Sequence, residues 1–239
     1  EVNEQGGVHG RKLKLLVEDD GYDPKKAVLA AQKLVNQDQV FIVVAHTGTA
    51  QNNAAMPIQF EKNVINFMPV TAAREMYEPL NRLKYSFAVT YFDQMRSFVP
   101  RMVKDKGAKK VCIIYQDDEF GLEVLRGTEY TELIHKLGGK AMDGLYATMG
   151  AQVPYLDEAS QPLRFWATKY KTRFNNEDPT VFSAYGYLIV DAFIKGATKA
   201  GPNLTTDSFI KAMDSMTIAP DIFGSAEATF TATKRLGSD

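Results

Sequence analysis

Short runs of apolar and β-branched residues recur along the first half of the chain, and polar or glycine-containing segments separate them. Within each run the apolar residues are nearly consecutive, which is typical of strands that lie buried between two layers of helices. The runs predict strands at residues 13–17, 40–45, 64–68, 85–89 and 111–115.

Amphipathic helical patterns lie between most of these runs. Asp23 followed by Pro24 is typical of a helix start, because the aspartate can cap free backbone amides and proline suits the first turn. Another helical pattern covers residues 98–106 and stops at Gly107. The alternation of strands and helices predicts an α/β fold with a mainly parallel sheet and right-handed crossovers.

The second half of the chain is richer in helical patterns. Residues 163–174 and 182–200 each place apolar side chains on one helical face, and Gly201 ends the second pattern. A third predicted helix begins at a capping residue, Thr205 or Thr206, and residues 223–236 look extended.

Composition places the chain among ordinary globular proteins. It has 239 residues, of which 45% are hydrophobic and 24% are charged, and its formal net charge is −1. This length allows one large domain or two modest ones. The balanced charge predicts no nucleic-acid partner, and no run approaches the ~18 apolar residues that would predict membrane insertion. The chain opens at Glu1 without a signal-peptide pattern, as expected of a mature or trimmed form.

Ligands of open parallel sheets bind beyond the carboxyl ends of the strands, so the corners after the predicted strands are the places to search. After residues 40–45, Gly48 lets the backbone approach a ligand closely. The hydroxyls of Thr47 and Thr49, with the free amides of the following helix start, favour a carboxylate. The alternative is an ordinary capping turn without a ligand.

Two further corners carry candidate ligand contacts. After residues 64–68, Thr71 and Ala72 are small and leave backbone groups within reach. After residues 111–115, Phe120 could lay an aromatic face over an apolar ligand. Simple turn packing and a buried core ring are the respective alternatives.

Metal and cofactor chemistry is not predicted. His46 follows the strand predicted at residues 40–45, but His9 and His135 do not stand at metal-ligand spacing from any partner. A pocket-lining or structural role for His46 is therefore the better interpretation.

Tests for catalytic motifs fail. Asp19 and Asp20 follow an apolar run, as the magnesium-binding acids of receiver domains do, but the runs ending at Ala45 and Met68 lack the aspartate that such domains phosphorylate. The chain has no nucleophile elbow, P-loop or dinucleotide-binding glycine motif. Binding is therefore favoured over catalysis, and the chain is predicted not to be an enzyme. An α/β enzyme that uses its acidic strand-end loops and a ligand-sensing domain of a receptor or regulator stay open as alternatives.

A set of motifs spans nearly the whole chain, at residues 1–12, 17–24, 47–49, 69–73, 119–121, 184–187 and 223–224. Together they resemble the branched-chain amino acid type of periplasmic solute-binding protein. The resemblance implies an α/β fold of two Rossmann-like lobes with three crossovers, the type I periplasmic binding protein fold, which closes like a hinged trap. It also implies a periplasmic receptor, or a tethered extracellular one in a one-membrane bacterium. Such a receptor delivers a small carboxylate, an amino acid or another organic acid, to the membrane permease of an ABC transporter.

The resemblance also implies a division into lobes and a set of site residues. Lobe 1 would hold residues 1–91 and 146–222, and lobe 2 would hold residues 92–145 and 223–239. Hydroxyls and amides of the first two corners would bind the ligand carboxylate, an aromatic ring would cover it, and two more aromatic residues would lie near the hinge and cleft. The predicted ligand-binding residues are His46, Gly48, Thr49, Ala50, Thr71, Ala72, Tyr91, Phe92 and Phe120.

The chain departs from the family pattern in three places. An opening strand with a ligand-contacting loop is missing, and the chain stops before the usual end. About two strand–helix units, on the order of sixty residues at ~30 residues per unit, are missing near Gly127. That stretch normally supplies acidic or aromatic ligand contacts, one of which Glu129 could match. The sequence therefore does not indicate which acid is bound.

Overall fold

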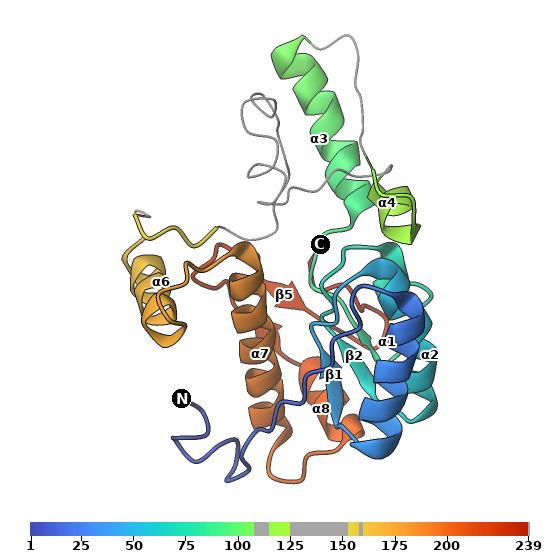
Figure 1. Cartoon of the computed structure of the whole chain (residues 1–239), viewed down its shortest axis with the longest axis vertical. Coiled ribbons are helices and arrows are strands. Elements are labelled where there is room, and N and C mark those ends of the chain that lie inside the picture. The colour runs from blue at the N-terminus through green and yellow to red at the C-terminus, as the bar shows by residue number, and fades with distance from the viewer. Residues whose placement is uncertain (108–114, 125–152, 158–159, 239) are drawn as a thin grey trace.

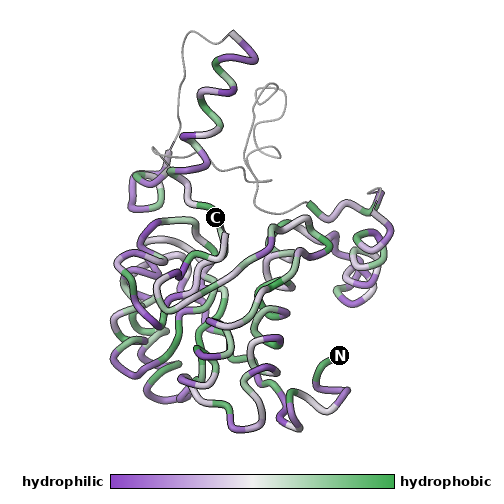
Figure 2. The backbone as a smooth tube through the Cα atoms, turned by 180° about the vertical axis from the view of Figure 1, so that it is seen from behind, coloured by the Kyte–Doolittle hydropathy of each residue, from purple (hydrophilic) through white to green (hydrophobic). Residues whose placement is uncertain are grey.

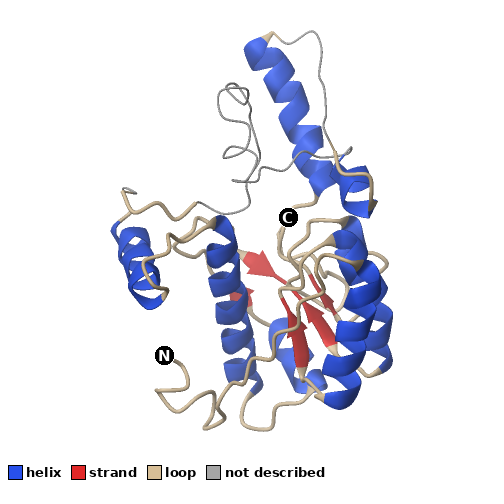
Figure 3. Cartoon of the chain, viewed as in Figure 1, coloured by secondary structure: helices blue, strands red, loops and turns tan. Residues whose placement is uncertain are grey.

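The computed structural model describes residues 1–107, 115–124, 153–157 and 160–238. A parallel sheet lies at its centre, with α1 and α2 over one face and α7 and α8 over the other (Figures 1 and 3). The helices are α1 (Pro24–Gln32), α2 (Thr49–Glu61), α3 (Tyr91–Lys106), α4 (Glu119–Val124), α6 (Gln161–Arg173), α7 (Val181–Ala200) and α8 (Thr206–Met213). A π turn at Lys33–Gln37 continues α1, and a 3₁₀ turn spans Arg74–Met76.

The central sheet confirms the predicted parallel arrangement. Its strands are β1 (Ile42–Val44), β2 (Ile65–Phe67) and β3 (Lys84–Tyr85), hydrogen-bonded in the order β1-β2-β3. Both pairs are parallel, with Ile42 opposite Ile65 and Phe67 opposite Tyr85. The carboxyl ends of the strands therefore open at one edge, where the candidate corners begin.

The prediction of a strand at residues 13–17 is wrong. Residues 12–20 form no strand, and Leu15 and Val17 are 71% and 76% exposed. The backbone of Leu13 bonds instead to the side chain of Asn3. An apolar run becomes a strand only where a neighbouring strand supplies ladder bonds, and β1 bonds only to β2 in the described sheet.

The strand predicted at residues 85–89 is shorter and begins one residue earlier, at Lys84. β3 ends at Tyr85, and Ser86 forms an isolated parallel bridge with Leu236. Residues 87–89 lead instead into α3. Of the strand predicted at residues 111–115, only Tyr115 is described, and it lies in no strand. Gly127, Glu129 and the expected break in the chain lie outside the described residues.

Helix boundaries follow the predicted capping residues closely. The Asp23 side chain accepts hydrogen bonds from the amides of Lys25 and Lys26 at the start of α1. Thr205 caps α8 in a reciprocal pair with Ser208. Figure 2 shows hydrophobic and hydrophilic positions alternating along α3, which stands away from the sheet.

The core lies between the sheet and the α7–α8 layer. Phe67 of β2 packs edge to face on Phe209 of α8, with ring centroids 5.6 Å apart, and Ile189 of α7 belongs to the same cluster. All three side chains are fully buried. This core fixes the position of β2 and therefore of the corner that follows it.

The C-terminal tail packs against β3. A short antiparallel pair, β4 (Thr217–Ile218) and β5 (Ala228–Thr229), leads into it. The Arg235 guanidinium is buried, lies 4.7 Å from the Tyr85 ring centroid and pairs with Asp214. The tail is thus bound to the sheet of the predicted first lobe, although it was assigned to the second. The lobe boundaries themselves stay a prediction.

Candidate functional site

The corners after β1 and β2 are held side by side by backbone hydrogen bonds. The Val70 amide donates to the His46 carbonyl at 3.0 Å, and the Gly48 amide donates to the Val70 carbonyl at 3.4 Å. Thr47 and Val70 form a parallel bridge. The two corners that the sequence singled out therefore form one continuous surface.

Gly48 gives the first corner its shape. Its φ of 98° lies in a region that residues with a side chain rarely adopt, and an added Cβ would stand 2.9 Å from the Tyr22 ring. Gly48 is the N-cap of α2 and supplies no capping side chain. The amides of Thr49, Ala50 and Gln51 precede the first bond of α2, from Asn52 to Gly48, so they point toward any acceptor at this corner.

Thr49 and Thr71 meet where the two corners join. Their hydroxyl oxygens are 2.7 Å apart, and the two residues are 0% and 5% exposed. The Ala73 amide donates to the Thr71 hydroxyl at 3.4 Å. Ala50 and Ala72, the small residues beside them, are also buried.

One aromatic ring contacts this pair, and a second packs on the first. Tyr91 opens α3 and donates a hydrogen bond of 3.5 Å to the Thr71 hydroxyl, and its amide bonds to the Ala72 carbonyl. The Phe120 ring, from α4, stands edge to face on Tyr91 with centroids 5.4 Å apart. The structure thus brings together Thr49, Thr71, Tyr91 and Phe120.

Phe92 and His46 lie to the sides of the threonine pair. Phe92 is partly exposed, and its ring lies under the Arg74 guanidinium at 5.3 Å. His46 Nε2 lies 2.9 Å from a carboxylate oxygen of Asp20, and both side chains are mostly buried. The other oxygen of Asp20 accepts the Tyr22 amide, as expected of a turn residue. The described residues contain no group of three histidine, cysteine, aspartate or glutamate side chains that could hold a metal ion.

Sequence reasoning missed Asn52, which ties the two corners from within. This buried side chain donates to the carbonyls of His46 and Gly48 at 2.8 and 2.7 Å, and it accepts from Asn66 of β2 at 3.1 Å. The only feature of the sequence that could have indicated this role is that an asparagine lies in the first turn of the helix that follows the corner.

The ion pair between Arg74 and Glu123 was not predicted from the sequence. Arg74 Nη2 donates to Glu123 Oε1 at 3.2 Å, with Glu123 2% exposed and Arg74 38% exposed. The hydrogen bond to the Glu123 carboxylate raises the pKa of Arg74 above its ordinary value. The partners are 49 positions apart, so no local pattern indicates them.

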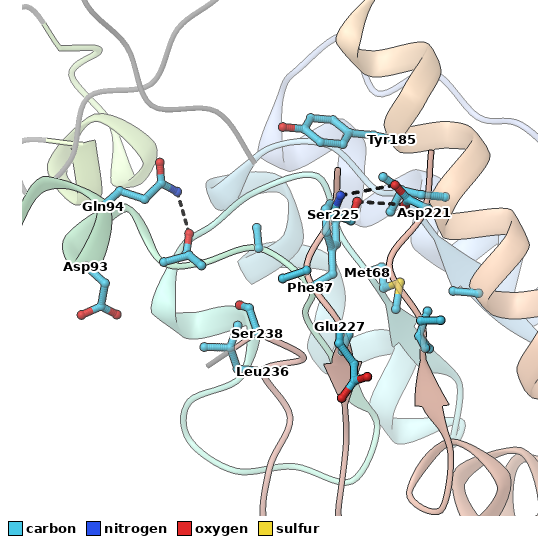
Figure 4. A pocket seen from close by; sticks show the side chains of 18 of the residues that line it. Met68, Phe87, Asp93, Gln94, Tyr185, Asp221, Ser225, Glu227, Leu236 and Ser238 are labelled. Carbon is cyan, nitrogen blue, oxygen red and sulfur yellow. Dashed lines mark hydrogen bonds between the residues drawn. The ribbon is translucent and has the colours of Figure 1, made fainter. Parts of the chain in front are cut away.

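A cavity of about 680 Å³ lies between the carboxyl ends of β2 and β3, α3, α7 and the β4–β5 hairpin (Figure 4). None of the nine predicted residues lines it. Its apolar wall includes Met68, Phe87 and Tyr185.

The polar groups of the cavity disfavour an anionic ligand. Among the described residues that line it, Asp93, Asp191, Asp221 and Glu227 are acidic and Arg101 is basic. Of these acids, Asp191 pairs with Lys195 at 2.6 Å. Carboxylates around one pocket repel a further negative charge. The corner formed by the threonines and the α2 amides therefore suits a carboxylate better than the cavity does.

Comparison with known proteins supplies a family match. A family model described as "Periplasmic binding protein" matches residues 1–131 and 125–239. Among curated proteins, an "Amino acid binding protein" of Pseudomonas aeruginosa is 30% identical over 142 residues, which are 59% of this chain and 37% of that protein. A "Leucine-, isoleucine-, valine-, threonine-, and alanine-binding protein" of the same organism is 29% identical over 62% of this chain and 39% of its own length. These matches span well under half the length of the relatives.

A solved structure extends the likeness over nearly the whole chain. A substrate-binding periplasmic protein from Ralstonia solanacearum superposes with a TM-score of 0.76 and 17% sequence identity, over 99% of this chain and 86% of that one. Within the described part of the chain, none of the helices is long and apolar enough for a membrane span.

Proposed function

Because the chain belongs to the periplasmic binding protein family, we propose that it is a solute receptor that captures a small carboxylate outside the cytoplasm and delivers it to an ABC-type uptake transporter. The receptor makes no covalent change to its ligand. The partners are the acid itself and a membrane permease.

The observation that carries this proposal is the junction of the two corners at Thr49 and Thr71. Their hydroxyls satisfy each other at 2.7 Å in the described structure. A bound carboxylate would replace this bond by accepting one hydrogen bond from each hydroxyl and others from the amides at the start of α2. The positive end of the helix dipole favours the same charge.

The aromatic cover supports an organic acid rather than an inorganic anion. Tyr91 and Phe120 stand over the corner and present apolar faces to the part of the ligand beyond its carboxylate. The curated relatives whose names specify leucine, isoleucine and valine make branched-chain amino acids the first candidates. Other aliphatic or aromatic carboxylic acids fit the same chemistry.

Capture would occur by closure of two lobes. Residues 1–91 and 146–222 would form lobe 1, and residues 92–145 would belong to lobe 2, so that α4 brings Phe120 over the corner from the opposite lobe. Because Tyr91 already bonds to Thr71 and covers it, a ligand must enter with α3 and α4 displaced. Ligand binding would then shift the population toward the closed arrangement.

A panel of small acids tests the proposal directly. The purified protein is screened by thermal shift with the twenty standard amino acids and with aliphatic and aromatic carboxylic acids, and native mass spectrometry identifies any acid that copurifies. A binding acid raises the apparent melting temperature by mass action. The matching amide or alcohol, which lacks the negative charge, is expected to have no effect. A panel in which amides stabilise the protein as strongly as acids would overturn the carboxylate assignment.

The enzymatic alternative uses Asp19 and Asp20. In the structure these carboxylates bond to the amides of Gly21 and Tyr22, and Asp20 also faces His46. These bonds account for both side chains as turn and pairing residues. Magnesium-dependent turnover that Asp19→Asn abolishes would favour the enzyme instead.

A further inference from the structure

The ion pair between Arg74 and Glu123 joins two segments that meet at the candidate site. Arg74 opens the 3₁₀ turn that follows the second corner, and Glu123 belongs to α4. The Glu123 carboxylate is 2% exposed and lies 3.2 Å from the guanidinium. Separating the partners would leave a carboxylate in a poorly hydrated place, which is unfavourable.

The pair fastens the same turn of α4 that carries Phe120. Phe120 and Glu123 are three residues apart and therefore lie on one side of α4. Their partners come from one short stretch of chain, because Arg74 follows Thr71 by three residues and Tyr91 connects Thr71 to Phe120. A polar contact and an aromatic contact thus hold one helical turn against one corner.

The first turn of α3 adds a third component. Tyr91 bonds to Thr71, and the next residue, Phe92, lies under the Arg74 guanidinium at 5.3 Å. The ring restrains Arg74 on one side while Glu123 binds it on the other. The guanidinium is therefore held in the orientation that meets α4.

We propose that Arg74 and Glu123 form a latch that positions Phe120 over the Thr49–Thr71 corner and slows release of the bound acid. Neither residue touches the acid. Both are positioning residues that favour the arrangement in which α4 covers the corner. This inference rests on the proposed function, because it assigns the covering turn a role in ligand retention.

Loss of the latch lowers the fraction of molecules in the covering arrangement. The bound acid then leaves more often, because it is released only from molecules in which α4 has uncovered the corner. Coupling of this kind is typically worth a factor of about 5 to 150, and a change of roughly tenfold in the opening equilibrium is expected here because Arg74 is partly solvated. The effect is expected in the dissociation rate, because the latch opposes the uncovering of the corner that release requires.

Hydrogen–deuterium exchange of the ligand-free protein tests the latch without a ligand. Glu123→Gln and Arg74→Gln are expected to speed amide exchange in residues 116–124 by roughly tenfold. Arg74→Lys, which keeps the charge, should stay close to the unmodified protein. Glu119→Gln removes an exposed carboxylate from the same helix and is the matched control. Exchange in both glutamine variants at the rate of the Glu119→Gln control would overturn the latch.

Stopped-flow release of L-leucine tests its role in retention. If the unmodified protein binds L-leucine, Glu123→Gln is expected to raise the dissociation rate roughly tenfold. An unchanged dissociation rate would overturn the role in retention. If the unmodified protein does not bind L-leucine, that result counts against the proposed branched-chain ligand, and the exchange measurement alone decides the latch.

Discussion

The hydroxyls of Thr49 and Thr71 face each other in a place where water has little access, with oxygen atoms 2.7 Å apart. Each hydroxyl can rotate and donate to a new acceptor without moving the backbone. A corner built in this way can take up a carboxylate by exchanging one internal hydrogen bond for two stronger, charge-assisted ones. Both residues were predicted from their positions after strands, because the carboxyl ends of parallel strands share one edge.

Removing either hydroxyl should weaken binding of the acid. A hydrogen bond to a charged group contributes roughly 1.5–3 kcal/mol, so Thr49→Ala and Thr71→Ala are each expected to raise the dissociation constant about tenfold or more. Isothermal titration with the acid that the panel returns measures the change. Thr168→Ala removes an exposed hydroxyl on α6 and serves as the control. Unchanged affinity in both corner variants would reject the site.

Short elements show where sequence reasoning succeeds and where it fails. The runs that became β1 and β2 were recognised because both faces of those strands are covered, and the caps at Asp23 and Thr205 were recognised because they act locally. The run at residues 13–17 is also mainly apolar, yet it forms no ladder. A strand depends on a neighbour elsewhere in the chain, and composition does not reveal that neighbour. The Arg74–Glu123 pair was not predicted for the same reason, because its two residues are far apart in the sequence.

The start of α2 depends on Asn52 more than on any pattern in its sequence. Asn52→Ala would leave the buried side-chain amide of Asn66 without its partner and would remove the bond from Asn52 to the His46 carbonyl, at a cost of roughly 1–3 kcal/mol in unfolding free energy. Chemical denaturation measures this loss. Asn53→Ala, one position along the same helix and partly exposed, should change stability by less than about 0.5 kcal/mol. Equal losses in the two variants would mean that Asn52 does not join the corners.

Contacts between β3, in the middle of the chain, and the C-terminal tail hold the fold together. Tyr85 of β3 donates a hydrogen bond of 3.0 Å to Asp214, which follows α8, and the Asp214 carboxylate pairs with Arg235 of the tail. Lys84, beside Tyr85, donates to the carbonyls of Glu75 and Glu78 in the loop after the second corner. One strand end therefore joins the tail, the α8 layer and the loop that carries Arg74.

From the buried side chains of β3 we predict how the unfolding free energy of the protein depends on pH in the alkaline range. Burial raises the pKa of the Tyr85 hydroxyl well above its ordinary value of 10.0. The unfolded chain therefore loses this proton first, and the stability that the neutral phenol contributes is present below pH 10 and is lost as pH rises toward the folded pKa. Lys84 acts in the opposite direction, because burial lowers its pKa, so its contribution becomes more favourable as pH rises toward 10.5.

Tyr85→Phe separates these two effects. The unfolding free energy of the unmodified protein, measured by denaturant titration between about pH 9 and 12, should fall above pH 10 with a Tyr85 contribution approaching ~1.4 kcal/mol per pH unit. In Tyr85→Phe that contribution is absent, so the fall should be shallower even though the variant starts from lower stability after losing its bond to Asp214. Tyr115→Phe, at an exposed position, should keep the original slope. Identical slopes in the two variants would show that the buried phenol does not control alkaline unfolding and that the β3–tail junction has opened before it titrates.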